Sequence, residues 1–243
     1  MEIQKNYTPL FYKVTQAEGG LSFVNKILSI EGIKDLCEAL KLNNKVNRLN
    51  LSNNNIGKEE CRLISELLRT NTSITELDLS KNMIEEKGIK KLLEGIEFNF
   101  TLKKINLSDN NFNGYIEEFS EYLCYNETIE ELDLSGNFLN EDGIFLVSQS
   151  LITNKKIKIM KLSDNRIGNY GMKYISESLK INKVIEEIDL SSNRIDEEGA
   201  EYLSEMLESN DTLNLIDFSF NEINSQGAYC IVESLKNNYN LKK

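Results

Sequence analysis

One side-chain amide recurs along the chain at a fixed spacing, and it is the first feature that could do chemistry. The spacings are 28, 28, 27, 28, 28 and 28 residues, for Asn54, Asn82, Asn110, Asn137, Asn165, Asn193 and Asn221. An asparagine amide donates two hydrogen bonds and accepts others at its oxygen. Stacked copies can therefore satisfy backbone groups that a turn leaves unpaired. We interpret this column as a structural ladder and not as a set of separate sites.

Serine recurs in the same way, two residues before each of these asparagines. The column consists of Ser52, Ser80, Ser108, Ser135, Ser163, Ser191 and Ser219. A serine repeated in every turn cannot be a unique nucleophile, and the chain has no histidine to activate one, which excludes Ser–His triads. The sequence also lacks a P-loop, a G-x-G-x-x-G loop and an EF-hand loop. We predict no catalytic residue, no metal and no cofactor.

The elements that position the ladder alternate along the chain. In the sixth repeat, Ile185, Ile188 and Leu190 follow a strand pattern, and Leu203 and Leu207 then follow helical spacing. Each repeat is thus predicted to be a strand, a turn, a helix and a return loop. A fixed period of this length indicates an array in which each repeat buries its apolar face against its neighbours.

The frame L-x-x-L-x-L-x-x-N-x-L, the 28-residue period and a glycine before the helix resemble the leucine-rich repeat family. The glycines are Gly88, Gly143, Gly171, Gly199 and Gly227. The period and the L-x-x-x-L helix core are similar to its ribonuclease-inhibitor-type subclass. The resemblance implies an α/β solenoid of horseshoe form, with parallel strands on the concave face and helices on the convex face. It also implies a protein partner that binds the concave face.

We predict one repeat domain over residues 1–243. Its parts are a lead-in at 1–17, a degenerate capping repeat at 18–45, seven repeats at 46–240 and the start of an eighth at 241–243. The apolar residues of the lead-in are expected to pack over the first repeat; they are Leu10, Phe11, Tyr12 and Val14. No C-terminal cap is visible, so either the natural chain ends there or it continues into further repeats.

One residue is missing between Asn110 and Asn137, and the shifted helix pattern places the deletion in the stretch 113–116. We predict a shortened or irregular turn there. A tolerated loop deletion is the simpler interpretation, and a distorted binding site is the alternative.

Composition limits the partners and the compartment. The net charge of −11 argues against nonspecific binding to nucleic acid or to an anionic membrane. No apolar run is long enough to span a membrane, and the N-terminus lacks the apolar region of a signal peptide. The four cysteines form no C-x-x-C pair, which indicates buried, reduced thiols. We predict a cytoplasmic protein, with the nucleus as an alternative.

The outward-facing strand positions carry charges whose sign alternates from strand to strand. Segments 103–106 and 158–161 are basic, whereas segments 130–133 and 186–189 are acidic. Opposite charges on neighbouring strands contribute about 0.2–1 kcal/mol per pair. We interpret the pattern as largely self-neutralising, and a charged partner is the alternative.

The last strand breaks this alternation. Leu215 and Phe220, together with Ile159, are expected to form an exposed apolar patch flanked by Arg166 and Arg194, a combination typical of binding surfaces. The predicted partner-binding residues are Ile159, Lys161, Arg166, Glu187, Asp189, Arg194, Leu215, Asp217 and Phe220. The competing interpretation is that Phe220 packs against further C-terminal repeats.

The sequence therefore predicts a non-catalytic protein-interaction scaffold for a partner whose identity it does not reveal, with no nucleic acid and no membrane involved. Two alternatives stay open. One is a RanGAP-like GTPase-activating regulator, and the other is a sensor or cytoskeletal module of a larger repeat protein. The oligomeric state is not predicted.

Overall fold

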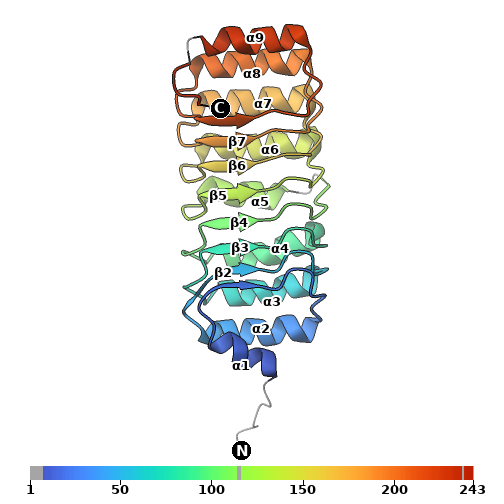
Figure 1. Ribbon diagram of the computed structural model, residues 1–243, viewed down its shortest axis with the longest axis vertical. Coiled ribbons are helices and arrows are strands. Elements are labelled where there is room, and N and C mark those ends of the chain that lie inside the picture. Colours follow the sequence, from blue (N-terminus) through green and yellow to red (C-terminus); the bar gives the residue numbers. More distant parts are fainter. Residues whose placement is uncertain (1–7, 114–115, 237, 243) are drawn as a thin grey trace, which may run out of the picture. The chain divides into compact units, whose positions relative to one another are not determined.

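The structure is a computed structural model that describes residues 8–113, 116–236 and 238–242. Strands and helices alternate along these residues (Figure 1). The chain divides into two compact units, residues 1–105 and 106–243, and each unit is described by itself. The subdivision of the sequence into lead-in, cap and repeats stays a prediction.

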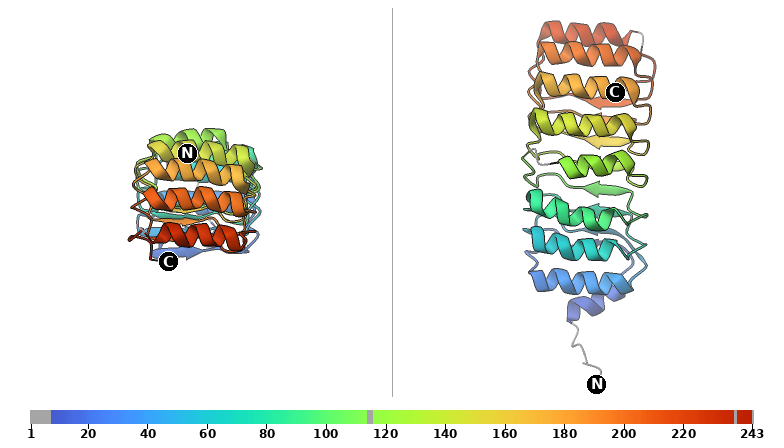
Figure 2. Two further views of the ribbon diagram at one scale, coloured as in Figure 1. Left: turned by 90° about the horizontal axis from the view of Figure 1, so that it is seen from above. Right: turned by 180° about the vertical axis from the view of Figure 1, so that it is seen from behind.

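In the first unit, parallel strands follow one another in chain order and pair with their sequence neighbours. Helices lie on one side of these strands (Figure 1; Figure 2, right). Its elements are α1 (Pro9–Thr15), β1 (Gly19–Ser22), α2 (Ile30–Leu42), β2 (Val46–Asn50), α3 (Lys58–Leu68), β3 (Glu76–Asp78) and α4 (Glu85–Ile96). Strand β4 (Lys104–Asn106) lies across the boundary between the units.

The second unit repeats the arrangement, again with parallel strands in chain order. Its elements are α5 (Glu117–Tyr125), β5 (Glu131–Asp133), α6 (Asn140–Thr153), β6 (Ile159–Lys161), α7 (Gly168–Ile181), β7 (Glu187–Asp189), α8 (Glu197–Ser209), β8 (Leu215–Asp217) and α9 (Ser225–Leu235). None of the helices in the described residues is long and apolar enough to cross a membrane.

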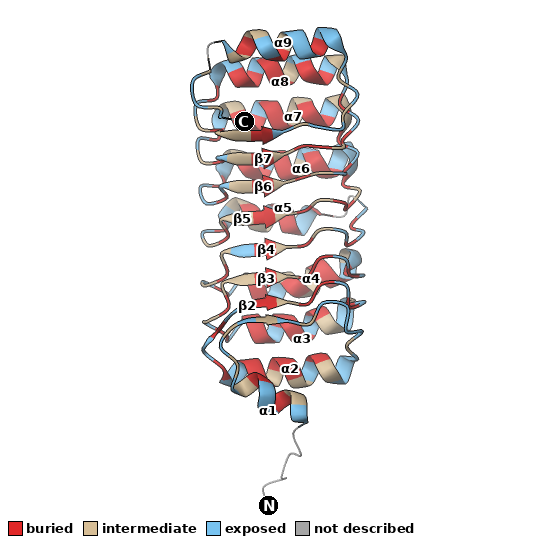
Figure 3. Cartoon of the chain, in the orientation of Figure 1, coloured by how far each residue is buried: buried red, intermediate tan, exposed pale blue. Residues whose placement is uncertain are grey.

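The core of each unit is built from the predicted periodic positions. Ile185, Ile188 and Leu190 are buried, and so are Leu203 and Leu207 on the following helix. Figure 3 shows such buried positions on the strands and helices of both units. Burial of a leucine or isoleucine side chain contributes about 1.5–3 kcal/mol, so the apolar pattern supplies the driving force for stacking.

The lead-in packs on the first repeat through part of its apolar residues. Phe11 and Val14 of α1 are buried, as expected, whereas Tyr12 is 61% exposed. Asn43 fastens the segment, because its Nδ2 donates to the carbonyl oxygens of Val14 at 2.9 Å and Ala17 at 2.8 Å.

The predicted asparagine column forms hydrogen bonds between successive repeats. Nδ2 of Asn165 donates to the carbonyl oxygen of Leu134, one repeat earlier, at 2.9 Å, and to that of Leu162 in its own repeat at 3.1 Å. Its Oδ1 accepts the backbone N–H of Asn137 at 3.1 Å. Asn193 is bonded to the preceding repeat in the same way. Each amide thus satisfies backbone groups at the turn after the strand.

A second asparagine ladder lies at the opposite ends of the strands, where the helix returns to the sheet. Nδ2 of Asn182 donates to the carbonyl oxygen of Leu151 at 2.7 Å, and its Oδ1 accepts the N–H groups of Val184 at 2.8 Å and Ile185 at 2.9 Å. The members of this column are Asn43, Asn71, Asn99, Asn126, Asn154, Asn182, Asn210 and Asn238. The sequence interpretation missed this ladder, although it follows the same period.

The predicted one-residue deletion in the stretch 113–116 lies directly before α5. Gly114 and Tyr115 lie outside the described residues, so the predicted irregular turn is not described. Helix α5 has 9 residues, whereas α6 to α9 have 11 to 14.

The cysteine thiols divide into two kinds. Cys37 and Cys61 are buried, and Cys124 and Cys230 are partly exposed; all four are free. Burial raises the pKa of the Cys37 thiol to about 12 and also raises the pKa of Cys61. Both buried thiols therefore stay protonated and unreactive at neutral pH.

The backbones of helices α3 and α4 lie close together at Gly95. A Cβ atom at this position would lie 2.2 Å from the carbonyl oxygen of Ser65. We therefore expect Gly95→Ala to lower the free energy of unfolding by about 1–3 kcal/mol, because the backbones must move apart. Urea unfolding followed by circular dichroism measures this loss. Gly20→Ala is the control, since its Cβ would meet only the Arg48 side chain at 3.6 Å; an equal loss in both variants would contradict the account.

The burial of the thiols predicts their reactivity. At pH 8, Ellman's reagent should modify Cys124 and Cys230 in the folded chain, and Cys37 and Cys61 only after unfolding in guanidinium chloride. Mass spectrometry of the modified peptides identifies the reactive thiols. Modification of Cys37 in the folded chain at the rate of Cys124 would show that the packing around α2 is wrong.

Candidate functional site on the strand face

A shallow depression of about 160 Å³ lies on the strand face of β6, β7 and β8, the face turned away from the helices. Its lining residues are Ile159, Met160, Lys161, Glu187, Ile188, Asp189, Leu215 and Asp217. The structure therefore brings together the predicted site residues Ile159, Lys161, Glu187, Asp189, Leu215 and Asp217. The predicted residues Arg166, Arg194 and Phe220 do not line the depression.

The strand register arranges these side chains in rows. Glu131, Ile159, Glu187 and Leu215 are aligned across β5 to β8. Neighbouring strands lie about 4.8 Å apart, so Ile159 and Leu215 stand roughly 10 Å apart on either side of Glu187. The row places two apolar side chains around one carboxylate.

A second row consists of Asp133, Lys161, Asp189 and Asp217. Nζ of Lys161 lies 3.3 Å from Oε1 of Glu131, which is the cross-strand pairing that the charge pattern predicts. Glu187 and Asp217, by contrast, form no ion pair with any described residue. The predicted pairing of opposite charges on neighbouring strands therefore forms at Lys161. It does not form at Glu187 of β7 or at Asp217 of β8, and these two strands carry an excess of negative charge.

The aspartates at the strand ends also hold the turns. Oδ1 of Asp189 accepts hydrogen bonds from the backbone N–H of Ser191 at 2.9 Å and from its hydroxyl at 2.7 Å. Oδ1 of Asp217 accepts the N–H of Ser219 at 2.8 Å. The charge pattern did not reveal this role, although the Asp-x-Ser at the ends of β3, β5, β7 and β8 is a signal for such a side-chain turn. Lys161 occupies the equivalent position on β6 and cannot accept such a bond.

The arginines and Phe220 lie beyond the strand ends, in the turns beside the ladder asparagines. All have left-handed backbone conformations, with φ of 57° for Arg166, 60° for Arg194 and 55° for Phe220. The guanidinium of Arg166 lies over the ring of Phe138, 4.4 Å from its centroid, so it already has an aromatic contact with the neighbouring turn. Arg194 is exposed.

Phe220 departs most from the turn pattern. Its ring is 88% exposed, and a left-handed backbone costs a bulky residue of order 1–3 kcal/mol. Two other turns of this unit have Gly136 and Ser192 at this position, also with positive φ. The sequence identified Phe220 by its exposed ring, but the strain is visible only in the structure.

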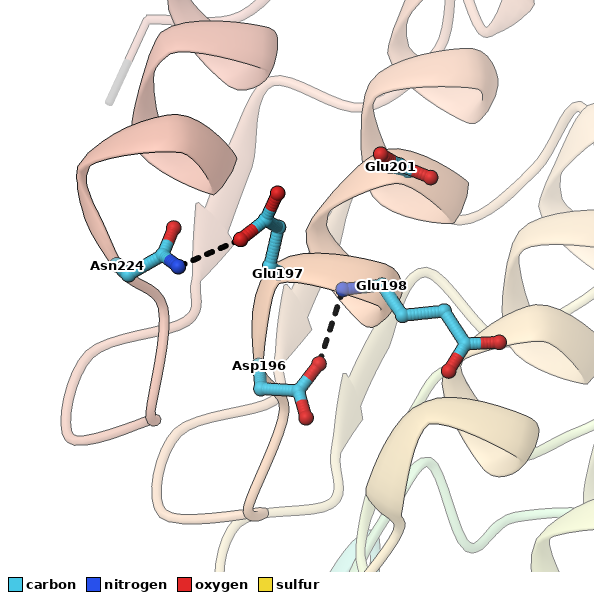
Figure 4. Close-up of a pocket in the computed structure, with 5 residues that line it drawn as sticks. All are labelled: Asp196, Glu197, Glu198, Glu201 and Asn224. Carbon is cyan, nitrogen blue, oxygen red and sulfur yellow. Dashed lines mark hydrogen bonds between the residues drawn. The ribbon is translucent and has the colours of Figure 1, made fainter.

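A larger depression, of about 480 Å³, lies between the first turns of α8 and α9 (Figure 4). Its carboxylates are held by local bonds: Asp196 accepts the N–H of Glu198 at 2.9 Å, and Asn224 donates to Glu197 at 2.6 Å. The carboxylates point in different directions (Figure 4). In the described residues no group of His, Cys, Asp or Glu side chains could hold a metal ion. These carboxylates are accounted for by capping and by the helix dipole.

Comparisons with known proteins place this fold. A family model described as Leucine Rich repeat matches residues 42–59, 70–93, 98–114, 125–147, 153–176, 182–204 and 209–232. Among solved structures, the leucine-rich repeat-containing protein LegL7 from Legionella pneumophila is similar, with a TM-score of 0.66 and 20% identity, over 95% of this chain and 77% of that one. Comparison with curated proteins finds no match.

Two further structures have lower scores. The tropomodulin C-terminal domain of Caenorhabditis elegans has a TM-score of 0.46 and 15% identity, over 71% of this chain and 90% of that one. Leiomodin-1 actin-binding site 2 has a TM-score of 0.32 and 14% identity, over 94% of this chain and 86% of that one. We draw the fold comparison from LegL7 alone.

The matched repeats cover most of the chain, and the strand–turn–helix units coincide with them. The ribonuclease-inhibitor-type subclass stays a prediction. Repeats of this kind indicate a protein-interaction scaffold, and proteins built from them are generally not enzymes. The chain belongs to the leucine-rich repeat family.

Proposed function

We propose that the chain is a non-catalytic scaffold whose protein partner binds the strand face of β6, β7 and β8. The observation that carries the proposal is the row in which Ile159 and Leu215 flank Glu187 within the depression. In a repeat array, the apolar side chains that recur in every repeat pack in the core. The side chains that differ between repeats therefore determine which partner binds.

The chemistry of this row defines a complementary partner. Ile159, Glu187 and Leu215 are half-buried, so a partner can complete their burial. Complete burial of one aliphatic side chain contributes about 1.5–3 kcal/mol. Because Glu187 and Asp217 lack an ion-pair partner among the described residues, a lysine or arginine of the partner is favoured between two apolar contacts.

Phe220 supports the proposal as an anchor at the margin of this surface. The left-handed backbone is shared by this position in other turns, such as those of Gly136 and Ser192, so the feature that suggests a functional role is the exposure of a large aromatic side chain there. Large aromatic side chains commonly dominate binding energy at protein interfaces.

The two alternative functions have no specific observation in their favour. Arg166, an arginine that a GTPase-activating regulator could use, is stacked on Phe138. A sensor or cytoskeletal module of a larger protein would use the same strand face as a scaffold does. We propose a cytoplasmic location, as the composition predicts.

The double variant Leu215→Asp/Phe220→Asp tests the proposal. It removes the apolar contacts and adds negative charge, so recovery of partners from an extract of the source cells should fall by about tenfold or more, equivalent to about 1.4 kcal/mol. Quantitative mass spectrometry of proteins captured by the immobilised full chain measures this fall.

Tyr125→Asp is the matched control, since Tyr125 is 84% exposed and lies at the end of α5, away from the depression. Circular dichroism confirms that each variant is folded. Unchanged recovery by a folded double variant, or equal losses in both variants, would exclude this surface.

A further inference from the structure

The helical side of the second unit carries several aromatic side chains on three neighbouring helices that the strand-face site does not use. We name this group the aromatic helix face; it consists of Phe145 on α6, Tyr170 and Tyr174 on α7, and Tyr202 on α8. The rings of Phe145 and Tyr174 meet edge to face, with centroids 5.0 Å apart. Phe145 is 41% exposed and Tyr170 is 59% exposed. Figure 2, right, shows these three helices side by side.

The two helices on either side of this face carry charges of one sign. Helix α6 begins with Glu141 and Asp142 in its first turn and contains no lysine or arginine. Helix α8 contains glutamates but also no lysine or arginine. The glutamates of α8 are Glu197, Glu198, Glu201, Glu205 and Glu208. The aromatic side chains are therefore flanked by acidic helices on both sides.

The structure already shows how this face binds cations. Nζ of Lys173 lies over the ring of Tyr202, 5.8 Å from its centroid, and Nζ of Lys180 lies 3.0 Å from Oε2 of Glu205. Both lysines belong to α7, and they neutralise only some of the carboxylates of α8. Glu201 and Glu208 are exposed and form no ion pair within the described part of the chain.

We propose that the aromatic helix face docks a basic amphipathic helix of another protein. The apolar side of such a helix would cover Phe145 and Tyr174, and its lysines and arginines would lie over the carboxylates of α8 and the first turn of α6. The flanks α6 and α8 lie two helix spacings apart, about 16–20 Å, and a helix of 18 residues that crosses the face is about 27 Å long, so it can reach both flanks. This is the usual mode of helix recognition by an apolar surface.

The charge distribution argues against the other occupants. A second copy of this chain that used the same face would bring acidic flanks together, and like charges in an interface are unfavourable. Nucleic acid and anionic membranes carry the same sign of charge as this face. Tyrosine rings and carboxylates together favour arginine and lysine, through cation–π contacts and ion pairs.

Fluorescence anisotropy with a synthetic peptide tests the proposal. The probe is a fluorescein-labelled peptide of about 18 residues, long enough to form a helix, with leucines on one side and lysines on the other. The full chain should bind it in physiological salt, and should not bind the same peptide with glutamates in place of the lysines. Phe145→Ala/Tyr174→Ala should weaken binding by about tenfold or more, whereas Tyr125→Ala should not.

A pair of charge variants separates this surface from the acidity of the whole chain. Glu198→Gln/Glu201→Gln should weaken binding by about threefold or more, and Glu85→Gln/Glu97→Gln, with the same change in net charge, should not. Leu215→Asp/Phe220→Asp should leave peptide affinity unchanged, so this test is independent of the strand-face site.

Three results would overturn the proposal. They are no binding of the lysine peptide, unchanged binding by folded Phe145→Ala/Tyr174→Ala, and equal losses in the two charge variants. Light scattering adds a fourth: a dimer that Phe145→Ala/Tyr174→Ala converts to a monomer would make a second copy the occupant.

Discussion

Every repeat must pair the backbone groups that its two turns leave without a strand or helix partner. An unpaired buried N–H or C=O group costs about 1–3 kcal/mol, and each turn exposes several such groups to the interior. Asparagine meets this need at both ends of the strands, because one amide can donate to the carbonyls of two neighbouring repeats and accept from a backbone N–H. Asn165 and Asn182 show the two versions of this arrangement.

Because of this constraint, the residues that stabilise the fold differ from those that can bind a partner. The recurring apolar residues pack in the core, and the ladder asparagines bond to the backbone. Partners are therefore selected by the side chains between these positions. On the strands of the second unit, these are the row of Ile159, Glu187 and Leu215. On the helices, they are the aromatic helix face and its acidic flanks. Both surfaces combine apolar side chains with unneutralised carboxylates. One lies on the strand face and the other on the helix face of the second unit, so the two can bind different partners.

The sequence predicted the fold because its period, its strand alternation and its helical spacing all indicate the same unit. The second ladder was equally predictable, because Asn182 and its counterparts recur with the same period, although they lie outside the frame L-x-x-L-x-L-x-x-N-x-L. The charge alternation predicted the pairing of Lys161 with Glu131, but it could not show that Asp189 also holds a turn. The strain at Phe220 and the contact of Phe145 with Tyr174 could not be predicted, since they depend on backbone angles and on how neighbouring helices pack. The turn at 114–115 lies outside the described residues.

The account rests on the asparagine ladders, and urea unfolding of single variants tests it most directly. Asn165→Ala and Asn182→Ala should each lower the free energy of unfolding by about 1–3 kcal/mol, because several buried backbone groups lose their partner. Asn44→Ala is the control, since Asn44 is exposed and its loss should change stability by less than about 0.5 kcal/mol. If both ladder variants were as stable as the Asn44→Ala variant, the ladders would not be what holds the repeats together.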